Sequence, residues 1–104
     1  MDKSDALRIS KGYLLRLRNS DIGFDEAWLF GSFARGNQHE NSDIDLAIIL
    51  KEDMNHTFET DVQLMVIRNG EETLIEPHAF SKDEFDYKLP IVNQIVKTGI
   101  KIEV

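Results

Sequence analysis

The run from Ile44 to Leu50 is the feature of this sequence that most restricts how the chain can fold. It reads Ile-Asp-Leu-Ala-Ile-Ile-Leu and has polar residues on both sides, which is typical of a buried strand. Successive side chains of a strand point to opposite faces. One face would then be wholly apolar, and the other would carry Asp43, Asp45, Ala47 and Ile49. The sequence thus predicts a strand whose far end is apolar on both faces and whose near end carries acid on one.

Three further elements can be predicted from the pattern of residues. Apolar residues recur with a helical period from about Ser4 to Asn19, which predicts an amphipathic helix. Ala27 to Phe30 is predicted to be a short strand that ends at Gly31. Thr73 to Glu76 is predicted to be another strand. Pro77 would mark its end or an edge position, because proline cannot donate a hydrogen bond to a neighbouring strand.

Residues 57 to 69 fit two different structures. Their apolar residues follow a helical period, and we prefer a helix for this reason. However, Asn69-Gly70 between apolar runs is also a strong signal for a β-hairpin turn. The sequence leaves both possibilities open.

The C-terminal part is predicted to contain a helix and a final strand. Ser81 to Glu84 has the form of a capping box. A helical segment should follow it, interrupted or restarted at Pro90 and capped at Gly99. Residues 100 to 104 alternate and could add an edge strand. Together the patterns predict an α/β or α+β fold, with helices packed on a small mixed sheet of three to four strands.

Length and composition narrow the class of protein. At 104 residues the chain has the usual size of one domain, so we expect residues 1–104 to form a single domain. The absence of cysteine excludes disulfides and thiolate metal sites and favours a reducing compartment. The N-terminus lacks a basic region followed by an apolar run, and no apolar run is long enough to span a bilayer. We therefore expect a soluble, cytoplasmic protein.

The formal net charge of -7 limits what the chain can bind. Proteins that bind nucleic acids usually gather lysine and arginine on one face, so a nucleic-acid partner is not expected. The same acidity would repel a bare triphosphate. Phosphate chemistry would therefore need divalent cations to screen the charge.

Two short motifs carry chemistry. Gly31-Ser32 follows a predicted strand, where glycine lets the backbone approach a ligand and free N–H groups and a hydroxyl can bind an anion. Asp43 and Asp45 lie two apart on a strand, so both carboxylates project from one face and can hold magnesium ions. Alone, Gly-Ser is usually a turn and Asp-x-Asp a solvated strand start. In combination they are more specific and predict that metal and phosphate share one cleft.

The combined pattern Gly31-Ser32-x-Ala34-Arg35-Gly36 followed by Ser42-Asp43-x-Asp45-Leu46 resembles the signature of the DNA polymerase β-like nucleotidyltransferase superfamily. In particular it is similar to the minimal nucleotidyltransferase domains of MntA-type antitoxins. The resemblance extends from the first predicted helix to the strand near Glu76. It implies a nucleotidyltransferase-like fold in which Gly31 and Ser32 bind the triphosphate of ATP or another NTP. It further implies that Asp43 and Asp45 bind Mg²⁺ in a two-metal site.

In that family a third carboxylate on a following strand completes the metal site and orients or deprotonates the acceptor hydroxyl. Glu76 is the candidate here, because it is the only acid after the aspartate pair that strand-like apolar residues flank. The alternative is an exposed glutamate at a strand end. Arg35 would either bind the nucleotide phosphates or pair with a neighbouring acid. His78 shares the strand parity of Glu76 and could help at the site, although we prefer a solvated or hydrogen-bonded histidine.

The resemblance implies an enzyme that transfers a nucleoside monophosphate to a hydroxyl acceptor and releases pyrophosphate, with AMP from ATP as the expected group. It also implies a small helical partner of the HEPN class, a toxin whose tyrosine would be the acceptor, with this chain as the antitoxin in a possible homo- or hetero-oligomer. Two alternatives stay open. One is a non-catalytic antitoxin that acts by occlusion, and the other is a small-molecule nucleotidyltransferase similar to the aminoglycoside-modifying enzymes.

Overall fold

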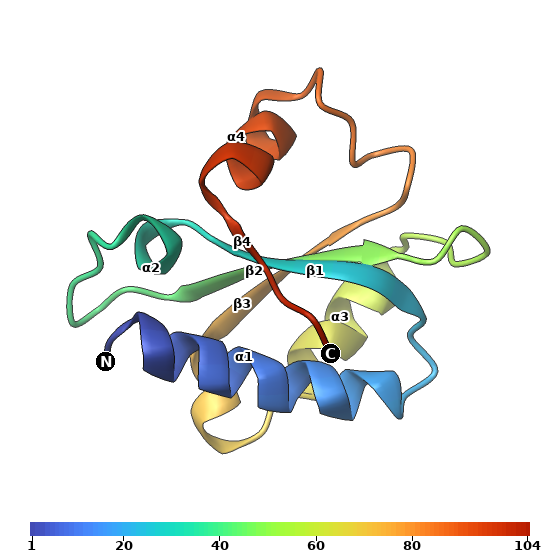
Figure 1. Ribbon diagram of the computed structural model, residues 1–104. Coiled ribbons are helices and arrows are strands. Elements are labelled where there is room, and N and C mark those ends of the chain that lie inside the picture. Colours follow the sequence, from blue (N-terminus) through green and yellow to red (C-terminus); the bar gives the residue numbers. More distant parts are fainter.

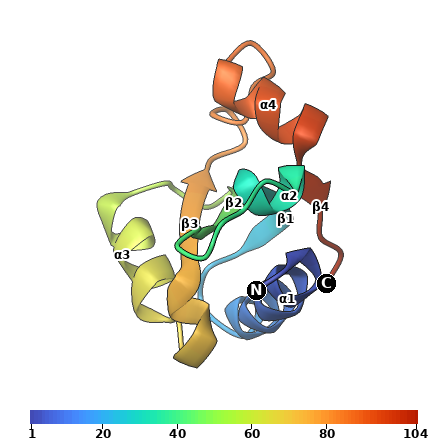
Figure 2. The same ribbon diagram turned by 90° about the vertical axis from the view of Figure 1, so that its left-hand side faces the viewer.

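The computed structural model describes every residue from Met1 to Val104 (Figure 1). The elements in chain order are α1 (Lys3–Arg18), β1 (Phe24–Phe30), α2 (Ser32–Arg35), β2 (Ile44–Leu50), α3 (Phe58–Val66), a 3₁₀ helix (Gly70–Leu74), β3 (Ile75–Phe80), α4 (Pro90–Thr98) and β4 (Ile100–Lys101). Helices α1 and α3 lie on one face of the sheet and α4 lies on the other, as Figures 1 and 2 show from two directions. The predicted α/β class is confirmed.

The sheet has the strand order β3-β2-β1-β4. Strand β1 is antiparallel to both of its neighbours, whereas β2 and β3 are parallel, so the predicted mixed sheet is confirmed. Strand β2 has the predicted bounds. Strand β1 begins earlier than predicted, because Phe24 pairs with Leu50 across an irregularity that leaves Asp25 without a partner residue. The C-terminal edge strand is confirmed as β4 and is only two residues long.

The segment after β2 forms the preferred helix, α3. The hairpin alternative is wrong, because Asn69-Gly70 begins the 3₁₀ helix and β3 runs parallel to β2. Strand β3 starts at Ile75 rather than at Thr73, which belongs to the 3₁₀ helix, and it continues past Pro77. Proline is tolerated there because β3 is an edge strand that bonds only to β2. The prediction that Pro77 occupies an edge position is thus confirmed, whereas the prediction that it marks the end of the strand is wrong.

The predicted capping box forms, but a turn follows it instead of a helix. The Glu84 N–H donates to the Ser81 hydroxyl at 3.1 Å, and the Glu84 carboxylate accepts from the Ser81 N–H at 2.8 Å. The ring of Phe85 then packs on Phe80, with centroids 5.5 Å apart. The Phe85 N–H donates to the Ser81 carbonyl at 3.1 Å, but the Asp86 N–H donates to the Glu84 carbonyl at 3.0 Å, so the helical hydrogen-bond pattern is not continued. The predicted restart at Pro90 is confirmed as the beginning of α4.

The core is divided between the two faces of β2, as the alternation of its residues predicts. The even-numbered residues of β2 lie in the larger apolar cluster with α1 and α3, while Ala47 and Ile49 pack with Ile95 of α4. The Tyr13 hydroxyl of α1 donates to the Leu64 carbonyl of α3 at 2.7 Å and joins these two helices. None of the helices combines the length and apolar character that crossing a membrane requires.

Candidate active site

Three strand ends meet at one place in the sheet. Phe30, the last residue of β1, pairs with Asp45 of β2, and Asp45 pairs in turn with Glu76 of β3. Gly31 follows β1 directly and caps the single-turn helix α2. The sheet therefore places the Gly-Ser motif, one aspartate of the predicted pair and the predicted third carboxylate at adjacent positions.

Asp45, Glu76 and His78 form a cluster whose potential ligand atoms all lie within 4.8 Å of one another. Nε2 of His78 is 3.3 Å from Oδ1 of Asp45 and 4.0 Å from Oε1 of Glu76. The side chains of Asp45, His78 and Glu76 are 26%, 36% and 53% exposed, respectively. The cluster is therefore held by the sheet on one side and accessible to a ligand on the other.

The geometry of this cluster fits a divalent cation. Ligands lie about 2.1 Å from a bound Mg²⁺ in octahedral geometry, so neighbouring and opposite ligand atoms are roughly 3 and 4.2 Å apart. The two distances from the His78 nitrogen, 3.3 and 4.0 Å, fall in this range. Carboxylate oxygens, the donors that Mg²⁺ prefers, are supplied by Asp45 and Glu76. A cation at this position would also offset the repulsion between the two carboxylates.

The other predicted site residues lie around the cluster. Asp43 immediately precedes β2, is exposed, and does not join the cluster. Ser32 is half-buried at the first position of α2. Arg35, at the last position of α2, is exposed. It forms no ion pair with an acid of this chain, so its guanidinium is available to an anionic ligand.

Gly31 adopts a conformation that only glycine allows at this position. Its φ angle is 78°, in the left-handed region that favours glycine. In addition, a Cβ atom at Gly31 would collide with the carboxylate of Asp45. The glycine thus lets this carboxylate lie directly against the backbone at the start of α2, which brings the two predicted motifs into contact.

We expect Gly31→Ala to lower the activity of this site on the order of 10²-fold, because displacing the Asp45 carboxylate by about 1 Å can have an effect of this size. Gly36→Ala is a matched control: Gly36 has nearly the same φ angle, 79°, but a Cβ there meets no atom within 4 Å. Both variants should lose roughly 1–2 kcal/mol of stability to backbone strain. Turnover and urea unfolding of the two variants would check this, and equal losses of activity would contradict it.

His78 is the member of the cluster that sequence analysis did not select as a site residue. Its Nε2 lies within hydrogen-bond distance of Asp45 Oδ1, inside the cluster. The imidazole also packs edge-on against Phe30, with ring centroids 5.1 Å apart. The sequence contained one indication of this position: His78 is two residues from Glu76 on a strand, so both side chains lie on the same face. This spacing alone could not show that β2 and β3 pair in the register that brings Asp45 close to both residues.

A groove of about 470 Å³ opens beside this cluster at the edge of the sheet. Glu76, Pro77 and His78 of β3 line it together with Asp61 and Met65 of α3. An acceptor molecule that enters the groove would meet the Glu76 carboxylate from the open side of β3.

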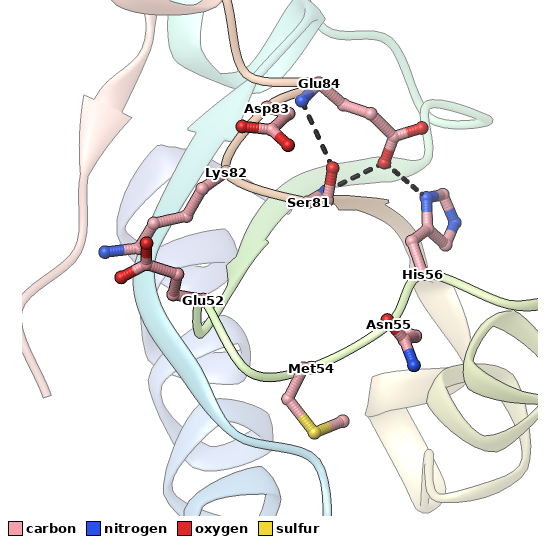
Figure 3. Close-up of a pocket in the computed structure, with 8 residues that line it drawn as sticks. All are labelled: Glu52, Met54, Asn55, His56, Ser81, Lys82, Asp83 and Glu84. Carbon is pink, nitrogen blue, oxygen red and sulfur yellow. Dashed lines mark hydrogen bonds and ion pairs between the residues drawn. The ribbon is translucent and has the colours of Figure 1, made fainter.

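A second pocket, of about 390 Å³, lies between the loops that follow β2 and β3 (Figure 3). At its rim two carboxylates hold His56: Nδ1 is 2.6 Å from Glu84, and Nε2 is 2.8 Å from Asp61. Partial burial lowers the pKa of His56, but the hydrogen bonds with Glu84 and Asp61 outweigh this effect and raise the pKa above its usual value. None of the predicted site residues lines this pocket. We interpret His56 as a structural link between the two loops and α3.

The link through His56 predicts a pH dependence of stability. Since the folded-state pKa exceeds the usual value of 6.5, its stabilisation is complete below pH 6.5 and is lost as the pH rises through the folded pKa. We therefore expect the free energy of unfolding to fall over the pH range that begins at about 6.5 and extends upward through the folded-state pKa. The variant His56→Gln should lack this part of the decrease, whereas His39→Gln, at an exposed histidine with no carboxylate partner, should retain it. Urea unfolding across this pH range is the measurement, and parallel curves for the wild type and His56→Gln would contradict the assignment.

Solved structures with a similar fold include a candidate nucleotidyltransferase from Sulfolobus solfataricus, with a TM-score of 0.67 and 21% identity over 95% of this chain and 80% of that one. A mutant of the toxin–antitoxin complex MntA–HpeT has a TM-score of 0.64 and 18% identity over 89% of this chain and 71% of that one. A toxin–antitoxin structure with AMP-PNP has a TM-score of 0.58 and 22% identity over 86% of this chain and 68% of that one. These similarities establish the fold.

Comparison with curated protein sequences finds no significant match. The profile of the family described as "Polymerase beta, Nucleotidyltransferase" matches residues 17–103. This match covers the Gly-Ser motif, the aspartate pair, Glu76 and all four strands of the sheet. The chain therefore belongs to the polymerase beta nucleotidyltransferase family and is a nucleotidyltransferase.

Proposed function

We propose that this protein transfers AMP from ATP to a hydroxyl group of a protein partner, with Mg²⁺ bound by Asp43, Asp45 and Glu76. The observation that carries this proposal is the convergence of Asp45 and Glu76 beside Gly31, within a nucleotidyltransferase fold. Two carboxylates next to a glycine-containing helix start supply ligands for cations and space for phosphate at the same position.

The residues of the site would have separate tasks in this reaction. Asp43, Asp45 and Glu76 would hold the ions, while Ser32 and Arg35 would bind the triphosphate. Bound Mg²⁺ would neutralise charge on the triphosphate and stabilise both the attacking and the leaving oxygen. The acceptor oxygen attacks the α-phosphorus in line, the bond from this phosphorus to the bridging oxygen breaks, and pyrophosphate leaves. Glu76 orients the acceptor hydroxyl and takes its proton.

An exposed apolar face of α3 supports a protein acceptor. Phe58, Val62, Met65 and Val66 follow a helical period and are 81%, 41%, 43% and 75% exposed, respectively. Large apolar side chains grouped on a surface mark protein interaction sites. Met65 also lines the groove that contains Glu76, so a partner bound to this face would lie beside Glu76.

The similar structures favour a particular kind of partner. Two of them are toxin–antitoxin structures, and one of these contains AMP-PNP, an analogue of ATP. On this basis we propose that the partner is a small helical toxin of the HEPN class and that a tyrosine hydroxyl of the toxin is the acceptor. The chain, with residues 1–104 acting as a single domain, would then be the antitoxin.

Incubation of the chain with the candidate toxin and ATP labelled at its α-phosphate tests this proposal. We expect label on a toxin tyrosine in the presence of Mg²⁺ and none after chelation by EDTA, because the triphosphate cannot be screened without the cation. If the chain neutralises the toxin but never labels it, the protein acts by occlusion and the proposed transfer is wrong. Label on a small-molecule alcohol in place of the toxin would support a small-molecule nucleotidyltransferase instead.

The contact surface can be tested in the same assay. Val66→Asp places a charge on the exposed apolar face of α3 and should weaken the complex with the toxin. Leu15→Asp is the matched control, since Leu15 is a 55% exposed apolar residue on α1, outside this face. Equal toxin affinity in the two variants would exclude α3 as the contact.

A further inference from the structure

We propose that His78 is a direct metal ligand through Nε2, together with Asp45 and Glu76, and that this position binds Mn²⁺ more tightly than Mg²⁺. The inference refines the proposed function, on which it rests for the metal-dependent reaction. It assigns one of the two ion positions to a donor set of two oxygens and one nitrogen. The Mg²⁺ that accompanies the triphosphate would occupy the other position.

The first support is the direction of the His78 nitrogen. Nε2 lies 3.3 Å from Oδ1 of Asp45 and 4.0 Å from Oε1 of Glu76. A single ion at about 2.1–2.2 Å from each ligand requires separations of roughly 3 to 4.2 Å. A contact with Asp45 alone would leave the position of Glu76 unexplained. Both distances from Nε2 fall in this range, and the three ligand atoms all lie within 4.8 Å of one another.

The second support is that the surrounding structure holds the imidazole in place. Glu76 and His78 are two residues apart on β3 and therefore lie on one face of the sheet, where Asp45 and Ala47 are their partners on β2. Phe30 packs edge-on against the ring at 5.1 Å and restricts its rotation. Little conformational freedom would thus be lost when a metal binds.

The donor set determines which ion the position prefers. Mg²⁺ is a hard cation that takes oxygen ligands and keeps several waters, so a nitrogen donor adds little to its affinity. Imidazole suits transition metals, and carboxylates together with water suit Mn²⁺. A site with two carboxylates, one imidazole and open positions for water is therefore better matched to Mn²⁺ than to Mg²⁺.

The alternative is that His78 only orients Asp45 by a hydrogen bond. Such a positioning residue would affect the affinities for Mn²⁺ and Mg²⁺ to a similar extent, because both ions would lose the same alignment of one carboxylate. A ligand affects Mn²⁺ selectively and, in addition, couples its nitrogen nucleus to the unpaired electrons of the ion. The two roles therefore differ in a spectroscopic property as well as in affinity.

Pulsed EPR of the nucleotide-free protein with Mn²⁺ measures this coupling directly. We expect a ¹⁴N coupling from the imidazole in the wild type and in His39→Gln, a control at an exposed histidine outside the cluster. His78→Gln should lose the coupling. Calorimetry should show that Mn²⁺ affinity falls about 10-fold or more in His78→Gln, whereas Mg²⁺ affinity changes by less than about 2-fold.

The wild-type spectrum decides the inference without a variant: Mn²⁺ bound to the protein with no ¹⁴N coupling would overturn it. Persistence of the coupling in His78→Gln, or equal losses of Mn²⁺ and Mg²⁺ affinity, would also overturn it. Those outcomes leave the proposed function intact if the toxin is still labelled. By contrast, a ¹⁴N coupling in a protein that never labels an acceptor would support the metal site and contradict the proposed transfer.

Discussion

Asp45→Asn should abolish nucleotidyl transfer, with a fall in kcat of about 10³-fold or more. The substitution keeps the shape of the side chain and removes a charge from the centre of the cluster, where Asp45 contacts both Gly31 and His78. Metal ions supply several kcal/mol of transition-state stabilisation, and each 1.4 kcal/mol corresponds to about 10-fold in rate. Losing one of the central ligands removes a large part of this effect.

The same variant should leave the fold intact, or slightly more stable, because repulsion from Glu76 is relieved. Asp53→Asn is the matched control, since Asp53 is an exposed aspartate in the loop after β2 and outside the cluster. Labelling of the acceptor, together with urea unfolding, separates loss of the metal site from loss of structure. Near-wild-type turnover in Asp45→Asn would contradict the proposed role of this carboxylate.

Glu76→Gln should have the second-largest effect and should act mainly on the chemical step. General-base catalysis and correct positioning of the nucleophile contribute typically about 10²–10⁴-fold, and Gln removes the charge at nearly constant volume. Binding of ATP with Mg²⁺ should change less than it does in Asp45→Asn, because Glu76 serves the acceptor side of the site. Single-turnover transfer measured at saturating ATP distinguishes the chemical step from binding.

The choice of control matters for this experiment. Glu72 lies near Glu76 in the sequence, but it is buried, forms a 3.1 Å ion pair with Arg16 and accepts a hydrogen bond from the Asn69 N–H. Its replacement would disturb the structure, since it would remove the ion pair and the hydrogen bond that satisfy this buried carboxylate. Glu103→Gln, at an exposed residue after β4, is the suitable comparison. If Glu76→Gln transfers nucleotide as fast as Glu103→Gln, the third carboxylate is another residue.

Local properties of the sequence determined the elements that carry the motifs. The alternation in β2 correctly predicted which residues face each layer, because side-chain direction in a strand depends only on position along the chain. The end of β1 before Gly31 and the restart at Pro90 were also predictable, because glycine and proline restrict the backbone locally. The first residues of β1 and β3 could not be predicted, because the limits of a strand depend on which residues of the neighbouring strand pair with it.

What the sequence by itself determined is the chemistry available to this protein: a Gly-Ser motif at Gly31, carboxylates at the start of a buried strand, and a further acid near Glu76. Only the tertiary structure decided how these groups are combined. The parallel register of β2 and β3 brings Asp45 to Glu76 and His78 while Asp43 stays outside the cluster. This register depends on how α3 and the 3₁₀ helix cross between the two strands and pack against α1. The burial of apolar side chains far apart in the sequence therefore selects the residues that meet at the site, which no local pattern can specify.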